Sequence, residues 1–314
     1  MAPHAAAPGA REIQRRLYAL AFDGANLDAA AEPAGGAASQ APIVSACTET
    51  LHGIELQPRY APRRPDHLTQ LLQAINEDAG SLDRIARIIG QDPALTGNLL
   101  RVANSPLYRV NERPIESLDR AMVVIGTNGM RAIIAAALFQ PVFEPDGPFA
   151  RVPPLVWDFT LRSAFAAEAH AAHIGKVDPF AAQLLALVLG LGTIVTLRVV
   201  LEAYAARPHI TPDAGVTVAI LDSWSCPTAR RIAASWGLSE RIQEALRLQL
   251  LDDDSASLTP LGRSLRFGRM AAALSLLVAA GQFDEGEAIA SLGAPSIHGP
   301  QVRQIWQRLL RPQD

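Results

Sequence analysis

Apolar residues recur every three or four positions along most of the chain, which is the spacing of one face of an α-helix. Between residues 66 and 139 this spacing predicts about five short helices, because capping residues precede most apolar runs and glycines follow them. After a proline-rich stretch at 141–154, the pattern predicts further helices over 155–174, 178–206, 216–223, 228–236, 239–251 and 261–281. No alternating pattern of comparable length predicts a strand. We therefore expect an all-α protein.

The two ends of the chain carry separate helical patterns. Residues 11–22 place Ile13, Leu17 and Leu20 on one helix face, which favours docking on the body of the same chain, with a disordered tail as the alternative. The run from 24 to 42 is rich in Ala, Gly and Pro and predicts a flexible linker. One final amphipathic helix is predicted around Val302, Ile305 and Leu309.

The segment FAAQLLALVLGLGTIVTL at 180–197 is apolar enough to be compared with a membrane span, although it only just reaches the necessary length. Asp178 and Pro179 form a helix start signal before it, and no basic cluster or aromatic belt flanks it. We expect a buried helix in which Gly190 and Gly192 permit close packing or a kink rather than phosphate binding.

Composition narrows the class of protein. The 314 residues are 49% apolar and 19% charged, so the chain can bury a sizeable core. Its 28 basic and 31 acidic residues give a net charge of -3, which disfavours nucleic acid and anionic lipid as partners. Two distant cysteines and the lack of a secretory signal pattern at the N-terminus favour a reducing cytoplasm. We expect a globular cytoplasmic protein that does not bind a membrane.

The stretch IIGQDPALTGNLLRVANSPLY at 88–108 has well-defined helix boundaries, since Gly90 can close one helix while Asp92 and Pro93 start the next. Together with 115–139, its order Asp-Pro, Leu-Leu, Asn-Ser and Ile-Gly resembles the HDOD domain, a helical regulatory relative of the HD metal-dependent phosphohydrolases. The residues that carry the resemblance are Asp92, Pro93, Leu99, Leu100, Asn104, Ser105, Ile125 and Gly126, with Trp236 further along the chain.

The resemblance implies a domain over 61–260 with two helical lobes, the first at 61–140 and an HD-like lobe at 155–260. Residues 1–60 then form an N-terminal extension with its linker, and 261–314 form C-terminal helices. The signature residues are interpreted as structural, with Asn104 and Ser105 satisfying backbone groups at a helix end. The alternative is that they border a ligand-sensing cleft with Arg101.

The resemblance also provides a test for catalysis, because HD enzymes hold divalent metals with His and Asp side chains on helices. It places the early His on Phe159, the contiguous His-Asp pair on Leu189 and Gly190, and a later His on Gln249. None of these side chains is a usual metal ligand. His170 and His173 share a helix face but lack a third ligand, and are interpreted as a solvent-facing helix end. We therefore predict no catalytic residue, no metal and no cofactor.

The function that this resemblance implies is a non-catalytic regulatory module of bacterial signal transduction that acts by protein–protein interaction with other signalling proteins. One alternative is a metal-dependent phosphohydrolase or phosphodiesterase with non-standard ligands. A second is a helical nucleic-acid-binding regulator that uses residues 127–139, although the start of that segment, TNGMR, carries one basic residue only.

Overall fold

The computed structural model describes residues 9–22, 36–54, 100, 103–104, 115–117, 120, 147–249, 258–293 and 297–310. The regular structure of these residues is helical, which confirms the predicted all-α class. Contacts divide the chain into two units, Met1–Pro62 with Pro141–Leu309, and Arg63–Gln140 with Leu310–Asp314. The predicted helices of 66–139 fall in the second unit, and most of them lie outside the described residues. So do the signature residues Asp92, Pro93, Leu99, Ser105, Ile125 and Gly126.

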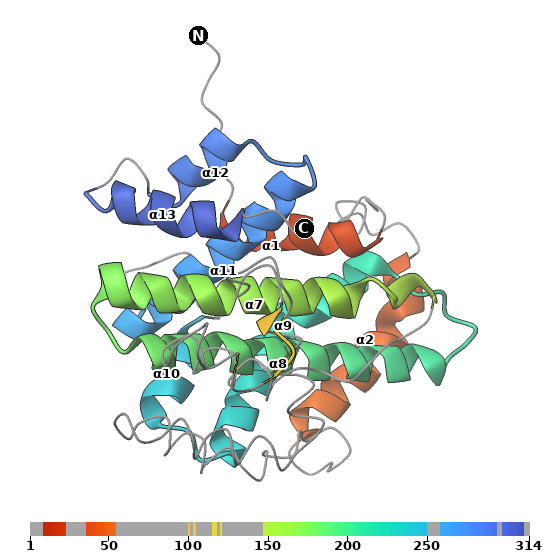
Figure 1. Cartoon of the computed structure of the whole chain (residues 1–314). Helices are drawn as coiled ribbons and strands as arrows, with labels where there is room; N and C mark the ends of the chain where they lie inside the picture. The colour runs from red at the N-terminus through yellow and green to blue at the C-terminus, as the bar shows by residue number, and fades with distance from the viewer. Residues whose placement is uncertain are drawn as a thin grey trace. The chain divides into compact units, whose positions relative to one another are not determined.

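Four long helices form the centre of the first unit: α7 (Val152–His170), α8 (Pro179–Ala205), α9 (Ala214–Ser235) and α11 (Pro260–Ala279). α8 packs against α7 and α9, and α11 packs along α7 (Figure 1). Among the described helices, α8 alone is long and apolar enough to span a membrane, yet 83% of its most apolar window is buried inside the protein. Its position in the core accounts for its hydropathy, as predicted.

Glycines allow these helices to approach closely. A Cβ atom on Gly190 would lie 2.3 Å from the side chain of Thr160 on α7, and one on Gly192 would lie 2.6 Å from the carbonyl oxygen of Ser225 on α9. Gly268 on α11 meets the backbone of α7 in the same way. The prediction that Gly190 and Gly192 serve close packing is therefore confirmed.

The helices predicted for the described residues 147–249 are present, but two of them are joined into one. Asp178 caps α8 by accepting a hydrogen bond from the Ala181 amide at 3.1 Å. The predicted helices 216–223 and 228–236 are instead the single helix α9, which contains Pro227 in its interior. A proline removes one backbone hydrogen bond, but the face on both sides of it, including Leu221 and Ile232, is buried and keeps the helix continuous.

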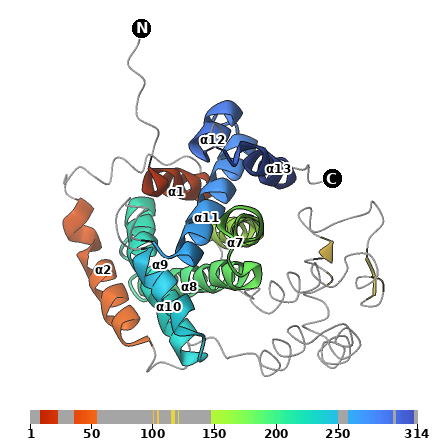
Figure 2. The same ribbon diagram turned by 90° about the vertical axis from the view of Figure 1, so that its left-hand side faces the viewer.

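The N-terminal region contains two helices that belong to the first unit. α1 (Ala10–Ala19) and the 3-10 turn η1 (Leu20–Phe22) follow the predicted pattern, and α1 packs along α11 (Figure 2). Ile13 and Leu17 are fully buried, so α1 docks on its own chain.

α2 (Gly36–His52) corrects the expected linker, because residues 36–42 are helical. Composition alone is misleading here: the helix is held by a buried face against α8 and α9, which no local property of the Ala-rich run reveals. Its buried side chains include those of Ile43, Cys47 and Leu51.

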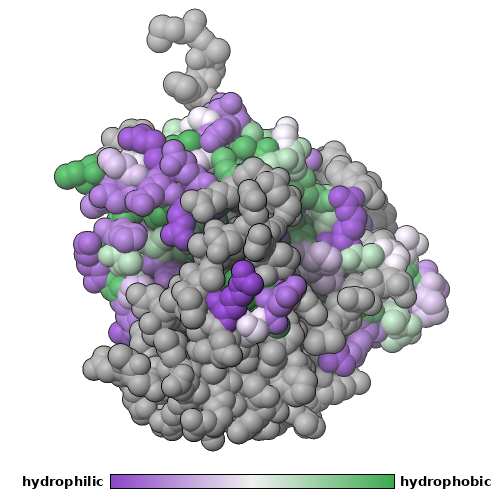
Figure 3. Space-filling view, in the orientation of Figure 1, coloured by the Kyte–Doolittle hydropathy of each residue, from purple (hydrophilic) through white to green (hydrophobic). Residues whose placement is uncertain are grey.

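Three shorter helices complete the unit: α10 (Glu240–Leu248), α12 (Glu285–Ser291) and α13 (Gly299–Leu309). α13 is the predicted final amphipathic helix, since Val302, Ile305 and Leu309 are buried. Hydrophilic side chains predominate over α12 and α13 on the face shown in Figure 3. α12 was not predicted, because its seven residues carry too short an apolar pattern.

Candidate functional site

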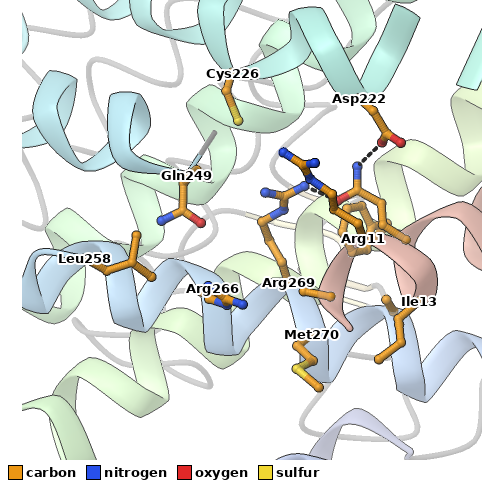
Figure 4. A pocket seen from close by; sticks show the side chains of 13 residues that line it. Arg11, Ile13, Asp222, Cys226, Gln249, Leu258, Arg266, Arg269 and Met270 are labelled. Carbon is orange, nitrogen blue, oxygen red and sulfur yellow. Dashed lines mark hydrogen bonds between the residues drawn. The ribbon is translucent and has the colours of Figure 1, made fainter. Parts of the chain in front are cut away.

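A cavity of about 90 Å³ lies in the first unit between α1, α7, α9 and α11 (Figure 4). Phe159 of α7 and Gln249, which directly follows α10, both line it. These are two of the positions where the resemblance places metal ligands. The fold therefore brings them together at one cavity, although neither can supply an HD-type ligand.

The other two positions where the resemblance places metal ligands, Leu189 and Gly190, are packed elsewhere. Leu189 is 5% exposed, and neither Leu189 nor Gly190 lines the cavity. Gly190 meets the Thr160 side chain, whose hydroxyl donates to the carbonyl oxygen of Val156 at 2.6 Å. An aspartate at position 190 would thus have no space in this packing. No group of three or more His, Cys, Asp or Glu residues in the described part of the chain could hold a metal ion, and the residues present do not fit one.

The cavity wall is largely apolar, but its charged groups are mostly basic, at a place where the resemblance puts the cation of an HD enzyme. Arg11 comes from α1, and Arg266 and Arg269 come from successive turns of α11. Asp222 of α9 is the one carboxylate among the described lining residues. These guanidinium groups disfavour a divalent cation by charge repulsion.

Gln14 connects three helices at the edge of this cavity. Its Nε2 donates to Oδ1 of Asp222 at 2.9 Å, and its Oε1 accepts a hydrogen bond from Nη2 of Arg269. Figure 4 shows both bonds beside Arg11. Burial raises the pKa of Asp222, while the positive charges of Arg269, Arg15 and Arg11 oppose that rise. α1 is therefore attached to α9 and α11 by polar as well as apolar contacts.

The remaining titratable neighbours add no negative charge at neutral pH. Burial raises the pKa of the Cys226 thiol, which lies beside Arg269. Burial also raises the pKa of Tyr18, and the charge of Asp222 raises it further.

Nε of Arg269 is buried and has no hydrogen-bond partner in the part of the chain that the structure describes. The cavity thus contains a buried donor with unused capacity.

The sequence contains a local cluster of arginines that the composition of the whole chain does not show. Arg266 and Arg269 stand three residues apart in a helix whose other residues are mostly apolar or small, so their side chains lie near one face. The net charge of the whole chain, -3, does not reveal this local cluster of positive charge. Asp222 and Arg11 gave no comparable signal, because only the packing of α1 and α9 brings them to α11.

His170 departs from the predicted solvent-facing helix end. His173 is exposed, but His170 is half-buried, where its Nδ1 shares a 3.0 Å hydrogen bond with Oγ of Ser264. Its ring lies 4.6 Å from that of Phe267. Burial, followed by the charges of His298 and Arg263, lowers the pKa of His170 to about 4. The correction arises because α7 continues into a π-helical turn, η5 (Ala171–Gly175), that packs on α11.

Glu168 is a second perturbed group that the sequence did not reveal. Burial raises the pKa of Glu168 to about 7, and the positive charge of Arg308 opposes the rise. Arg308 itself stacks 4.5 Å from the ring centre of Phe165. Neither Glu168 nor His170 lines the cavity, so they form no shared site with it.

In the second unit, Asn104 follows the helical residue Ala103 and joins two segments of backbone. Its Nδ2 donates to the carbonyl oxygens of Leu100 and Ile115 at 2.8 Å each, and its Oδ1 accepts from the Ile115 amide at 2.7 Å. Both amide hydrogens are therefore engaged with the backbone.

Trp236 of the signature set lies in the first unit, where it ends α9 and is 3% exposed. Gly237 follows it with φ 66, and the amide of Leu238 donates to the carbonyl of Ala233 at 2.9 Å. This is a Schellman arrangement, in which glycine supplies the left-handed residue.

Comparison with solved structures supports the fold. The chain is similar to a Shewanella amazonensis SB2B protein provisionally named a metal-dependent phosphohydrolase, with a TM-score of 0.53 and 19% identity over 84% of this chain and 99% of that one. It is also similar to an HDOD domain protein of unknown function from Geobacter sulfurreducens, with a TM-score of 0.50 and 19% identity over 87% and 91% of the two chains. No curated protein matches the chain.

The family model described as HDOD domain matches residues 61–250, which is more than half of the chain. This span contains the signature pairs of the first lobe, the buried Trp236, and Phe159 and Gln249, which line the cavity. By sequence and by helical fold together, the chain belongs to the HDOD domain family.

Proposed function

We propose that this protein is a non-catalytic regulatory module of cytoplasmic signal transduction in bacteria, and that it acts by binding other signalling proteins. The observation that carries the proposal is the composition of the cavity at the lost ligand positions. Arg266 and Arg269 occupy its wall, whereas a phosphohydrolase of the HD type needs a cluster of His and Asp ligands there.

The packing of α7 on α8 supports the same proposal. The side chain of Thr160 lies against Gly190 and fills the space that an aspartate ligand at position 190 would need. A metal ligand at this position would therefore require a different contact between α7 and α8.

Metal loading followed by an activity assay tests the non-catalytic part. The purified full chain is incubated with Mn²⁺, Fe²⁺, Co²⁺ and Ni²⁺ in turn, desalted, analysed for metal content and assayed with a generic phosphodiester and with cyclic dinucleotides. We expect no stoichiometric metal and no turnover. Tight metal binding with turnover that disappears on chelation would contradict the proposal and favour a phosphohydrolase.

Affinity capture from the native cytosol, followed by rebinding of the purified candidate partner, tests the protein-binding part. The full chain is the appropriate bait, because deletion of 1–60 would remove the buried Ile13 and Leu17 and disturb the core itself. Saturable binding of one signalling protein is expected. Salt-sensitive binding to random duplex DNA instead would favour a nucleic-acid-binding regulator.

A further inference from the structure

We propose that the cavity between α1 and α11 is a binding site for a phosphate group, either free phosphate or the phosphomonoester of a larger ligand. This inference does not depend on the proposed protein-binding function. Its residues are Arg266 and Arg269 of α11 with Arg11 of α1.

The first argument is charge. Three guanidinium groups and one carboxylate line the cavity among the described residues, and the other polar lining groups are the amides of Gln14 and Gln249 and the thiol of Cys226. The set is therefore complementary to an anion and repels a cation. Part of the wall is apolar, and reduced contact with water strengthens interactions between charges there.

The second argument is an unused donor. Arg269 donates through Nη2 to Gln14, while its buried Nε has no hydrogen-bond partner in the described part of the chain. A buried donor without a partner costs free energy, so a ligand oxygen that accepts from it would be stabilised. Gln249 lies at the same cavity, and its Nε2 donates to the Gly262 carbonyl at 2.9 Å, which holds the amide in place.

The third argument is size and geometry. A cavity needs roughly 10–15 Å³ of water-accessible volume to hold one water, so a cavity of about 90 Å³ has room for several waters or for a small ion in their place. That space is sufficient for a phosphate group. Arg266 and Arg269 lie on successive turns, and planar guanidinium groups match the spacing of phosphate oxygens.

The site also includes α1, because Arg11 and Gln14 form part of its wall. A phosphate that contacts Arg11 and Arg269 together would join α1 more firmly to α11. Binding would therefore protect the α1 backbone from hydrogen exchange, which provides a second readout in addition to affinity.

Titration calorimetry of the full chain with inorganic phosphate at constant ionic strength tests the proposal. We expect saturable binding of one phosphate per chain, and binding at least about tenfold weaker for acetate, which has fewer oxygens and less charge. Glycerol 3-phosphate distinguishes the two sources: tighter binding than free phosphate assigns a phosphomonoester, and equal or weaker binding assigns phosphate itself.

The principal variant is Arg266→Gln, which should weaken phosphate binding by about tenfold or more. Arg266→Lys keeps the positive charge but loses the planar guanidinium group, and should give an intermediate loss of phosphate affinity. Arg303→Gln on α13 is the matched control, because Arg303 is exposed and does not line the cavity. Circular dichroism confirms that each variant is folded.

Three results would overturn the proposal: no saturable phosphate binding to the unaltered chain, equal affinity of the Arg266→Gln and Arg303→Gln variants, or acetate binding as tight as phosphate. Protection of α1 amides by phosphate that is lost in Arg266→Gln would support it independently of calorimetry.

Discussion

At the residue scale, the contact between Gly190 and Thr160 leaves no space for a larger side chain at position 190. The Cβ of any residue at position 190 would lie 2.3 Å from the methyl and hydroxyl groups of Thr160, which is far inside van der Waals contact. A change of the Thr160 rotamer would cost free energy, because the side chain is buried and its hydroxyl donates a hydrogen bond to the Val156 carbonyl oxygen of the same helix. Glycine at 190 is thus required by packing.

Gly190→Ala should lower the free energy of unfolding by about 1–3 kcal/mol, because the added methyl group overpacks the crossing of α7 and α8. Urea denaturation monitored by circular dichroism measures the change. Gly53→Ala is the control, since a Cβ at Gly53 meets nothing within 4 Å. Equal stability of the two variants would show that the crossing relaxes without cost.

His170 and Glu168 should give opposite pH dependence. The pKa of His170 falls from 6.5 to about 4, so its contribution to stability is complete above about pH 6.5 and is lost as the pH falls towards 4. The pKa of Glu168 rises from 4.5 to about 7, so its contribution is complete below about pH 4.5 and is lost as the pH rises towards 7.

Urea denaturation between pH 4.5 and 7.5 separates the two groups. His170→Gln should lose less stability than the unaltered chain on acidification, and Glu168→Gln should lose less as the pH rises. His173→Gln, at an exposed position on the same helical segment, should follow the unaltered curve. If all the curves are parallel, the burial of these two groups does not control their protonation.

At the element scale, the two N-terminal helices show how tertiary contacts override local composition. α1 has a regular apolar face, and its docking could be predicted from Ile13 and Leu17. α2 begins in a Gly- and Ala-rich run and contains Pro42, so its pattern indicated a linker. Gln40 joins it to the core, because its Nε2 donates to the Thr211 carbonyl at 3.0 Å and its Oε1 accepts from the Tyr204 hydroxyl at 3.1 Å.

Leu17→Ala should destabilise the protein by about 2–5 kcal/mol, because Leu17 is fully buried on the inner face of α1 and its truncation leaves a cavity. Val44→Ala on α2 is the comparison, since Val44 is 42% exposed and should cost less than about 1 kcal/mol. Chemical denaturation gives both values. A small effect of Leu17→Ala would mean that α1 detaches readily and is not part of the core.

At the scale of the first unit, the four-helix centre separates positions that the resemblance assigns to one metal site. Phe159 and Gln249 face the cavity, whereas Leu189 and Gly190 pack within the core. α1 contributes to the cavity wall, and the guanidinium groups of α11 supply its charge. The arrangement is suited to an anion, and a metal site could not be rebuilt there from two side chains.

The double variant Phe159→His and Gln249→His tests this argument. It places two imidazoles at the cavity, but we expect no stoichiometric Mn²⁺ binding, because two ligands are too few and Arg266 and Arg269 repel the cation. Calorimetry with Mn²⁺ measures the affinity, and circular dichroism verifies folding. Tight Mn²⁺ binding by this variant would show that the cavity still has the geometry of a metal site.

The periodicity of apolar residues determined the all-α class, the core placement of α8 and the bounds of most described helices, because these depend on local spacing and burial. The signature residues likewise determined the family. The placement of a lost ligand at Phe159 stays a prediction from the resemblance. Only the tertiary structure decided that α2 is a helix, that Pro227 lies within α9 and that His170 is half-buried. It also decided that Arg11, Asp222 and Arg269 meet at one cavity. These features depend on contacts between residues far apart in the chain, and no local pattern specifies which distant helices will meet.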